Sequence, residues 1–143
     1  DPLESAVTRF KEFFRKYPVE ATSIENAVAS DILCTVTPAR EPVVKSEWIV
    51  PGTHINAIGT LYPDRREVDS VCVQRSRVIV DSRERALKEE GEVLIPIREG
   101  LLKPQHIYGE LGEIVAGVKG GRTNEEEITL FLSGAISIEY VAV

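Results

Sequence analysis

The sequence has no methionine, only two cysteines and one tryptophan, and no long apolar run. A complete translation product begins with methionine, so we expect a processed or truncated chain. Its apolar runs fall short of the roughly 20 residues that a membrane-spanning helix needs, which predicts no membrane partner. The first residues are acidic where a secretory signal is basic, so no signal peptide is expected.

Positive charge is also in deficit. The 17 Lys and Arg residues stand against 23 Asp and Glu residues, which gives a net charge of −6. Nucleic-acid surfaces need clustered Lys and Arg to bind phosphates, so the sequence predicts no nucleic-acid partner. The 143 residues are 43% hydrophobic, which suits one domain with a buried core.

The few cysteines and histidines do not form a recognisable metal motif. Cys34 and Cys72 lack Cys-x-x-Cys spacing, and neither His54 nor His106 stands at ligand spacing from them. We expect two buried thiols in a reducing, cytoplasmic compartment and no metal. A disulfide stays open, although nothing in the sequence requires one. His54 is expected to be structural, and His106 to lie at the surface.

Hydrophobic periodicity predicts alternating helices and strands. Apolar residues recur at helical spacing from Leu3 to Tyr17, and Pro18 ends this helix. Further helices are expected at 24–29 and 83–90, capped by Ser23 and Ser82, at 67–73, at 105–118, as one turn at 46–49, and from about Ser137. Strands are expected at 32–36, 54–59, 77–81 and 127–132, with a further short one possible at 19–22.

This alternation predicts an α/β fold, a partial Rossmann-like parallel sheet flanked by helices. The run at 32–36 is apolar without alternation, which is typical of a central strand covered on both faces. Ligands of such sheets bind at the carboxyl ends of the strands. The segments to watch are therefore 37–39, 59–61, 81–82 and 132–134.

A glycine-rich phosphate turn is missing. The sequence contains no Gly-x-Gly-x-x-Gly, and Gly109 and Gly112 are expected within a helix, far from a strand end. Gly91 is expected to end the preceding helix. Glu110 and Glu113 would share one helix face, exposed to solvent or in contact with another domain. From the residues alone, this is a parallel α/β domain without visible chemistry.

The run from Trp48 to Gly59 (WIVPGTHINAIG) resembles the central block of the ornithine cyclodeaminase/mu-crystallin family. The resemblance continues on both sides, over essentially the whole chain. The other similar blocks are Thr35–Pro38, Glu41–Val43, Arg77–Asp81, Gly109–Gly117, Gly121–Thr123 and Glu126–Thr129. Together these blocks are specific, although each one alone is weak.

The resemblance implies a two-part parent protein. Family members have an outer dimerisation domain that carries substrate-binding Arg and Lys, and a Rossmann domain that binds NAD or NADP. Residues 1–143 resemble an incomplete NAD(P)-binding domain, without the upstream glycine-rich turn and the outer domain. We expect the parent to be a homodimer that acts on a small amino or imino acid, and this fragment alone to be inactive.

The resemblance also aligns several residues with family positions at the cofactor. Asp1 aligns with the residue that reads the adenosine ribose, where a carboxylate repels a 2′-phosphate and favours NAD over NADP. Thr37 aligns with a threonine beside the cofactor, and Ile58, Gly59 and Thr60 with backbone that passes the nicotinamide. Each has a local alternative: a helix start at Asp1, a strand-end hydroxyl at Thr37, and a turn glycine at Gly59.

Three further positions bear on the chemistry. Arg65 matches a basic residue near the cofactor, or is a solvated loop arginine, and Ser133 matches a serine next to the nicotinamide. Leu61 stands where ornithine cyclodeaminases have a catalytic aspartate, and a leucine takes no proton. The resemblance therefore implies an imine (ketimine) reductase or amino-acid dehydrogenase rather than a cyclodeaminase. The alternative is a non-enzymatic binding or structural protein like mu-crystallin, so whether the parent is an enzyme stays open.

Overall fold

The computed structural model describes residues 2–59 and 61–134. The helices are α1 (Pro2–Phe13), α2 (Ile24–Val28), α3 (Ser70–Arg75), α4 (Arg83–Glu89), α5 (Gly91–Arg98) and α6 (Leu111–Val115), with 3-10 turns η1 (Ser46–Trp48) and η2 (Pro104–His106). The strands are β1 (Ile32–Thr35), β2 (His54–Ala57), β3 (Arg77–Val80), β4 (Ile107–Glu110) and β5 (Thr129–Leu132). Asp1, Thr60 and the helix expected from Ser137 lie outside the described residues.

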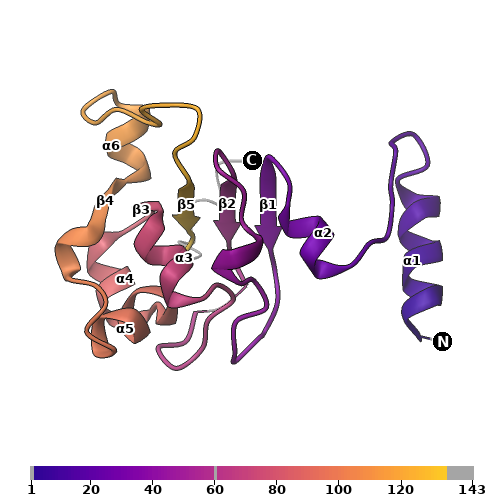
Figure 1. Ribbon diagram of the computed structural model, residues 1–143, viewed down its shortest axis with the longest axis horizontal. Helices are drawn as coiled ribbons and strands as arrows, with labels where there is room; N and C mark the ends of the chain where they lie inside the picture. Colours follow the sequence, from indigo (N-terminus) through magenta and orange to yellow (C-terminus); the bar gives the residue numbers. More distant parts are fainter. Residues whose placement is uncertain (1, 60, 135–143) are drawn as a thin grey trace.

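The strands form one parallel sheet in the order β1-β2-β5-β3-β4 (Figure 1). This confirms the α/β fold with a Rossmann-like parallel sheet. The strands expected at 32–36, 54–59, 77–81 and 127–132 are all present, each slightly shorter than predicted. Because every strand runs in the same direction, all carboxyl ends meet at one edge of the sheet.

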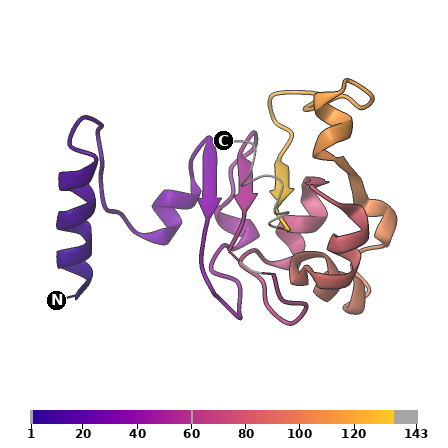
Figure 2. The same ribbon diagram turned by 180° about the vertical axis from the view of Figure 1, so that it is seen from behind.

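One face of the sheet holds the core. Side chains alternate along β2, β3 and β5, and the buried ones pack with residues of α3, α4 and α5 such as Val73, Ala86 and Val93. The opposite face is half exposed, and α6 covers part of it. Helix α1 stands apart from the sheet in both views (Figures 1 and 2), with Phe13 83% exposed.

Strand β1 differs from its prediction. It lies at the edge of the described sheet, and its side chains alternate between exposed and buried, with Ile32 66% exposed. The apolar run was expected to be covered on both faces, which is wrong for the described chain. Cys34 points to the uncovered side and is exposed, so the expectation of two buried thiols holds for Cys72 alone. Residues 19–22, all described, form no strand.

The helix expected at 105–118 is wrong. This stretch contains η2, then β4, then α6, because Ile107 and Gly109 are buried with the two-residue period of a strand. Gly109 therefore lies near a strand end rather than within a helix. The Glu113 side chain accepts a hydrogen bond from the Glu110 backbone N–H at 2.9 Å, so this pair caps the start of α6.

Two helix boundaries also differ. The helix expected from residue 67 begins at Ser70, because the Asp69 carboxylate accepts from the Cys72 N–H at 2.7 Å and caps α3. Gly91 begins α5 instead of ending α4. A Cβ at Gly91 would lie within 3.0 Å of the Arg65 carbonyl oxygen, so the glycine allows the 62–65 turn to approach. The predicted caps Ser23 and Ser82 are confirmed.

No helix in the described ranges is long and apolar enough to cross a membrane.

Candidate functional site at the carboxyl edge of the sheet

The carboxyl edge brings four of the predicted residues together. Thr37 follows β1, Ile58 and Gly59 follow β2, and Ser133 follows β5, and these strands are neighbours in the sheet. Ile58 is 37% exposed, Thr37 and Gly59 are half-buried, and Ser133 is buried. Three adjacent strand ends therefore present these residues along one line, where parallel sheets bind ligands.

A buried carboxylate joins the first two strand ends. Glu67 is 0% exposed and accepts three hydrogen bonds: from the Thr37 N–H at 2.6 Å, the Gly59 N–H at 2.8 Å and the Thr35 hydroxyl at 2.7 Å. Its own N–H donates to the Glu92 side chain at 2.9 Å. Glu67 therefore fixes the loop after β1 against the loop after β2.

Gly59 is required by this arrangement. A Cβ there would lie 2.5 Å from Glu67 Oε1 and within 3.0 Å of the backbone N and O of Thr37. The sequence indicated a glycine that lets a cofactor approach, but the space beside its Cα is filled by the protein itself. The glycine thus permits the close contact between the two loops.

The third strand end lies over a pair of acidic side chains. The Ser133 N–H donates to the Ala57 carbonyl at 3.4 Å. A Cβ at Gly134 would lie 3.0 Å from Glu90 Oε1 and 3.2 Å from Asp81 Oδ1. Asp81 follows β3, so this pair lies beneath the ends of β3 and β5.

Glu90 is the unusual member of this pair. It is 2% exposed, and neither of its carboxylate oxygens has a hydrogen-bond partner among the described residues. Burial, with repulsion from Asp81 and Glu92, raises the pKa of Glu90 to about 8. The Glu90 carboxyl is therefore protonated and neutral at pH 7, which removes the cost of a buried charge.

Leu61 and Arg65 lie in the loop that follows β2. Leu61 is 36% exposed, so no packing prevents a polar side chain at this position. The Arg65 guanidinium stacks on the Tyr62 ring at 4.4 Å, and its buried Nε has no hydrogen-bond partner in the described part of the chain. Arg65 is thus half-buried and held by an aromatic ring rather than being a freely solvated arginine.

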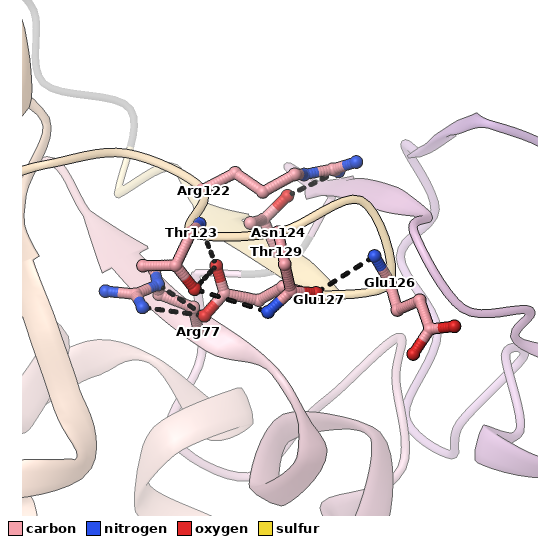
Figure 3. A network of polar contacts seen from close by, with 7 residues as sticks. All are labelled: Arg77, Arg122, Thr123, Asn124, Glu126, Glu127 and Thr129. Atoms are coloured by element: carbon pink, nitrogen blue, oxygen red, sulfur yellow. Dashed lines mark hydrogen bonds and ion pairs between the residues drawn. The ribbon is translucent and has the colours of Figure 1, made fainter.

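A second hollow lies on the half-exposed face of the sheet. This cavity of about 490 Å³ is lined by the residues of β2, β3 and β5 that point to this face, by Leu111 and Ile114 of α6, and by Gly121 and Arg122. Figure 3 shows its polar rim, where the Arg77 Nη2 lies 2.7 Å from Glu127 Oε1 and Arg122 donates to the Thr129 hydroxyl at 3.3 Å.

The two histidines make local contacts. His54 Nδ1 lies 2.7 Å from the hydroxyl oxygen of Thr129, as expected of a structural residue. His106 Nε2 lies 2.9 Å from the Val73 carbonyl, and the side chain, expected at the surface, is half-buried. Among the described residues, no group of three or more His, Cys, Asp or Glu side chains could hold a metal ion.

Sequence reasoning missed Glu67 and Glu90. Glu67 was assigned to the start of a helix, and Glu90 to the end of another, where acidic residues are ordinarily solvated. The turn at 62–65, just before Glu67, packs closely against Gly91 at the start of α5, just after Glu90. The sequence carries one weak signal of this: Glu90 and Glu92 flank Gly91, and glycine often marks a close approach of backbone.

Comparisons with known proteins agree on one family. The profile of the ornithine cyclodeaminase/mu-crystallin family matches residues 2–143. The chain is 38% identical over 145 residues to alanine dehydrogenase of Archaeoglobus fulgidus, covering 100% of this chain and 45% of that protein.

Two solved structures share the fold, and both hold a bound nicotinamide cofactor. Delta(1)-pyrroline-2-carboxylate reductase of Thermococcus litoralis, in complex with NADH and L-proline, matches with 51% identity and a TM-score of 0.79, over 84% of this chain and 37% of that one. An archaeal alanine dehydrogenase dimer with bound NAD matches with 36% identity and a TM-score of 0.89, over 97% and 44%. The chain spans less than half the length of these relatives. It belongs to the ornithine cyclodeaminase/mu-crystallin family.

Proposed function

We propose that this chain is the nicotinamide-binding part of an NAD(H)-dependent oxidoreductase of amino and imino acids, with a cyclic imine as its substrate class. The observation that carries the proposal is the carboxyl edge, where Glu67 fixes Thr37 and Gly59 beside the end of β5. The 51% identity to a reductase crystallised with NADH and L-proline supports the cofactor and the substrate class.

The edge fits one half of the cofactor. Thr37, Ser133 and the backbone at Ile58 place polar groups at adjacent strand ends. The sequence has no Gly-x-Gly-x-x-Gly turn for the pyrophosphate. We therefore propose that residues 1–143 are an incomplete NAD(P)-binding domain, completed by a glycine-rich turn and an outer domain elsewhere in the parent.

In this proposal, the residues of this chain bind and orient the nicotinamide cofactor. When bound, the nicotinamide supplies or takes the hydride. Thr37, Ile58, Gly59 and Ser133 follow strand ends that the sheet fixes, and they would hold the nicotinamide ring against the substrate carbon. The family resemblance adds Thr60 to this proposed set. In the parent, a carboxylate at Asp1 favours NAD over NADP by repelling a 2′-phosphate. The ratio of kcat/KM for NADH and NADPH measures this preference.

Leu61 decides between imine reduction and ornithine cyclisation. An aspartate two residues after Gly59 can accept a proton, whereas a leucine cannot, and a general base contributes about 10²–10⁴-fold to a rate. We expect the full-length protein to oxidise NADH with a cyclic imine and to release little ammonia from ornithine. Leu61→Asp should raise ammonia release, and since Leu61 is 36% exposed the aspartate needs no buried charge.

The same assays test the alternative. Robust ornithine turnover by the wild type would contradict the assignment and indicate another base. Binding of NADH without turnover of any imine would favour a non-enzymatic binding protein. The proposed parent is a homodimer of the cytoplasm, in keeping with the two free thiols. Residues 1–143 alone should show no turnover, because the phosphate turn and the outer domain are missing from them.

A further inference from the structure

Glu67 has no assigned role, yet it occupies the centre of the carboxyl edge. Its Oε1 accepts the Thr37 N–H at 2.6 Å, and its Oε2 accepts both the Gly59 N–H at 2.8 Å and the Thr35 hydroxyl at 2.7 Å. The Glu67 carbonyl oxygen accepts the N–H groups of Val43 and Val44, each at 2.9 Å. Side chain and backbone are therefore both fixed.

The identity of the groups that donate to Glu67 is more informative than their number. Two of them are backbone N–H groups of Thr37 and Gly59, the residues that the proposed function places at the nicotinamide. A carboxylate accepts charge-assisted hydrogen bonds, which are shorter and stronger than neutral ones. One side chain thus sets the separation of two loops before any cofactor arrives.

We infer that Glu67 is a positioning residue, whose buried side chain holds the β1 and β2 strand-end loops at the separation that the nicotinamide requires. This inference rests on the proposed function. Glu67 is 0% exposed, so it acts through the backbone of Thr37 and Gly59 and touches neither cofactor nor substrate. A shift of about 1 Å in a positioned group can cost about 10²-fold in rate, so its effect on catalysis should be measurable.

Glu67→Gln is the sharpest substitution, because it keeps the size and shape of the side chain. The amide has one oxygen in place of two, so its NH₂ group must face the N–H of either Thr37 or Gly59. Two donors then point at each other, and one loop loses its anchor.

Glu127→Gln is the matched control. Glu127 is also a partly buried, hydrogen-bonded carboxylate, which accepts from Arg77 at 2.8 Å and from the Thr123 N–H at 2.7 Å. It precedes β5, so it lies at the amino ends of the parallel strands, opposite the carboxyl edge of the proposed site. Its loss should lower stability without moving the carboxyl edge.

The experiment compares both variants with wild type in the full-length protein, using NADH fluorescence titration and steady-state kinetics below the unfolding transition. We expect Glu67→Gln to raise the Kd for NADH about tenfold or more and to lower kcat, since each tenfold is one lost interaction of about 1.4 kcal/mol. The KM of Glu67→Gln for the imine should stay within about twofold of wild type. The Kd of Glu127→Gln for NADH should also stay within about twofold of wild type. A purely structural role would lower the folded fraction and leave the Kd unchanged.

Equal NADH affinity of the two variants would overturn the inference. A wild type that binds no NADH would instead overturn the proposed function, and the inference with it. If Glu67→Gln fails to fold, amide hydrogen exchange of the wild type decides. The Thr37 and Gly59 amides should be protected without NADH, whereas protection that arises only on adding NADH would contradict pre-positioning by Glu67.

Discussion

At the scale of single residues, the carboxyl edge contains buried carboxyl groups in two different hydrogen-bonding environments. Glu67 accepts hydrogen bonds from two loops, as a group with many donors should. Glu90 has no hydrogen-bond partner among the described residues, and it remains neutral at pH 7 because burial raises its pKa to about 8.

The raised pKa of Glu90 predicts a pH-dependent stability. The folded state keeps a proton that the unfolded chain releases above the ordinary pKa of 4.5, so the Glu90 contribution to stability falls as the pH rises from 4.5 to about 8. Glu90→Gln removes this dependence. Urea denaturation at pH values from 4.5 to about 8 measures this. Across that range, the free energy of unfolding of the variant should rise relative to that of wild type by on the order of 4 kcal/mol.

Four charged side chains surround Glu90 and affect its pKa. Asp81, Glu92 and Glu89 raise its pKa by repulsion, while Arg85 lowers it. Parallel stability profiles of wild type and Glu90→Gln would contradict the prediction, since they would mean that Glu90 binds the same number of protons in both states.

Gly59→Ala tests the close approach of two loops. The new Cβ would lie 2.5 Å from Glu67 Oε1 and within 3.0 Å of Thr37 backbone atoms, which cannot yield without separating the loops. We expect a loss of about 3 kcal/mol or more in the free energy of unfolding.

Gly112→Ala is the control for that change. Gly112 lies in α6, and a Cβ there would meet no described atom within 4 Å. Alanine favours a helix over glycine by about 1 kcal/mol, so this variant should be neutral or more stable in the same denaturation experiment. Equal losses at both positions would show that the clash at Gly59 is relieved by local movement.

At the scale of elements, single polar side chains cap the starts of α2, α3 and α4. Asp69 caps α3 through Oδ1, and its Oδ2 accepts the Ser46 N–H at 2.8 Å, which ties η1 to the same point. The Val44 carbonyl accepts the Asp69 N–H at 3.1 Å. One residue thus orders two turns far apart in the sequence.

Removing this cap should lower the free energy of unfolding by more than removing an ordinary N-cap does. Asp69→Ala loses both hydrogen bonds, so we expect a decrease of about 2 kcal/mol in the free energy of unfolding. Asp69→Asn keeps an oxygen for the Cys72 N–H and should cost less. Thermal unfolding of both variants measures this, and equal losses would mean that the charge rather than the cap stabilises α3.

At the scale of the whole molecule, the sheet has two unlike faces. Helices α3, α4 and α5 pack on one face, whereas β1 leaves Ile32 and Cys34 exposed at the edge of the described sheet. Cys72 lies in the core, where burial and the nearby Asp69 raise its pKa to about 12.

This asymmetry predicts unequal thiol reactivity. The thiolate is the reactive form, so Cys72 should be inert in the folded chain for lack of both access and ionisation. A chromogenic disulfide reagent at pH 8 should titrate Cys34 rapidly and Cys72 only after unfolding. Two fast-reacting thiols in the native protein would contradict the packing of α3.

Local patterns were enough to predict most of the fold. The strand runs, the caps at Ser23 and Ser82 and the blocks around Trp48–Gly59 depend on neighbours in the sequence, and they determined the parallel α/β fold and the family. Strand β4 was not predicted, because its burial alternates over only four residues beside a longer helix-like run. For a segment this short, the local sequence pattern favours a helix, whereas packing against the rest of the sheet favours a strand. The packing determined the structure.

The site divides in the same way. The sequence determined which loops end the strands, and so placed Thr37, Gly59 and Ser133 at one edge; their contacts with a cofactor stay a prediction. Only the tertiary structure decided that Glu67 joins two of those loops and that Glu90 is buried without a hydrogen-bond partner in the described chain. The physical reason is that burial of a carboxyl group depends on residues distant in the sequence, such as Thr37 and Glu67, which are 30 positions apart.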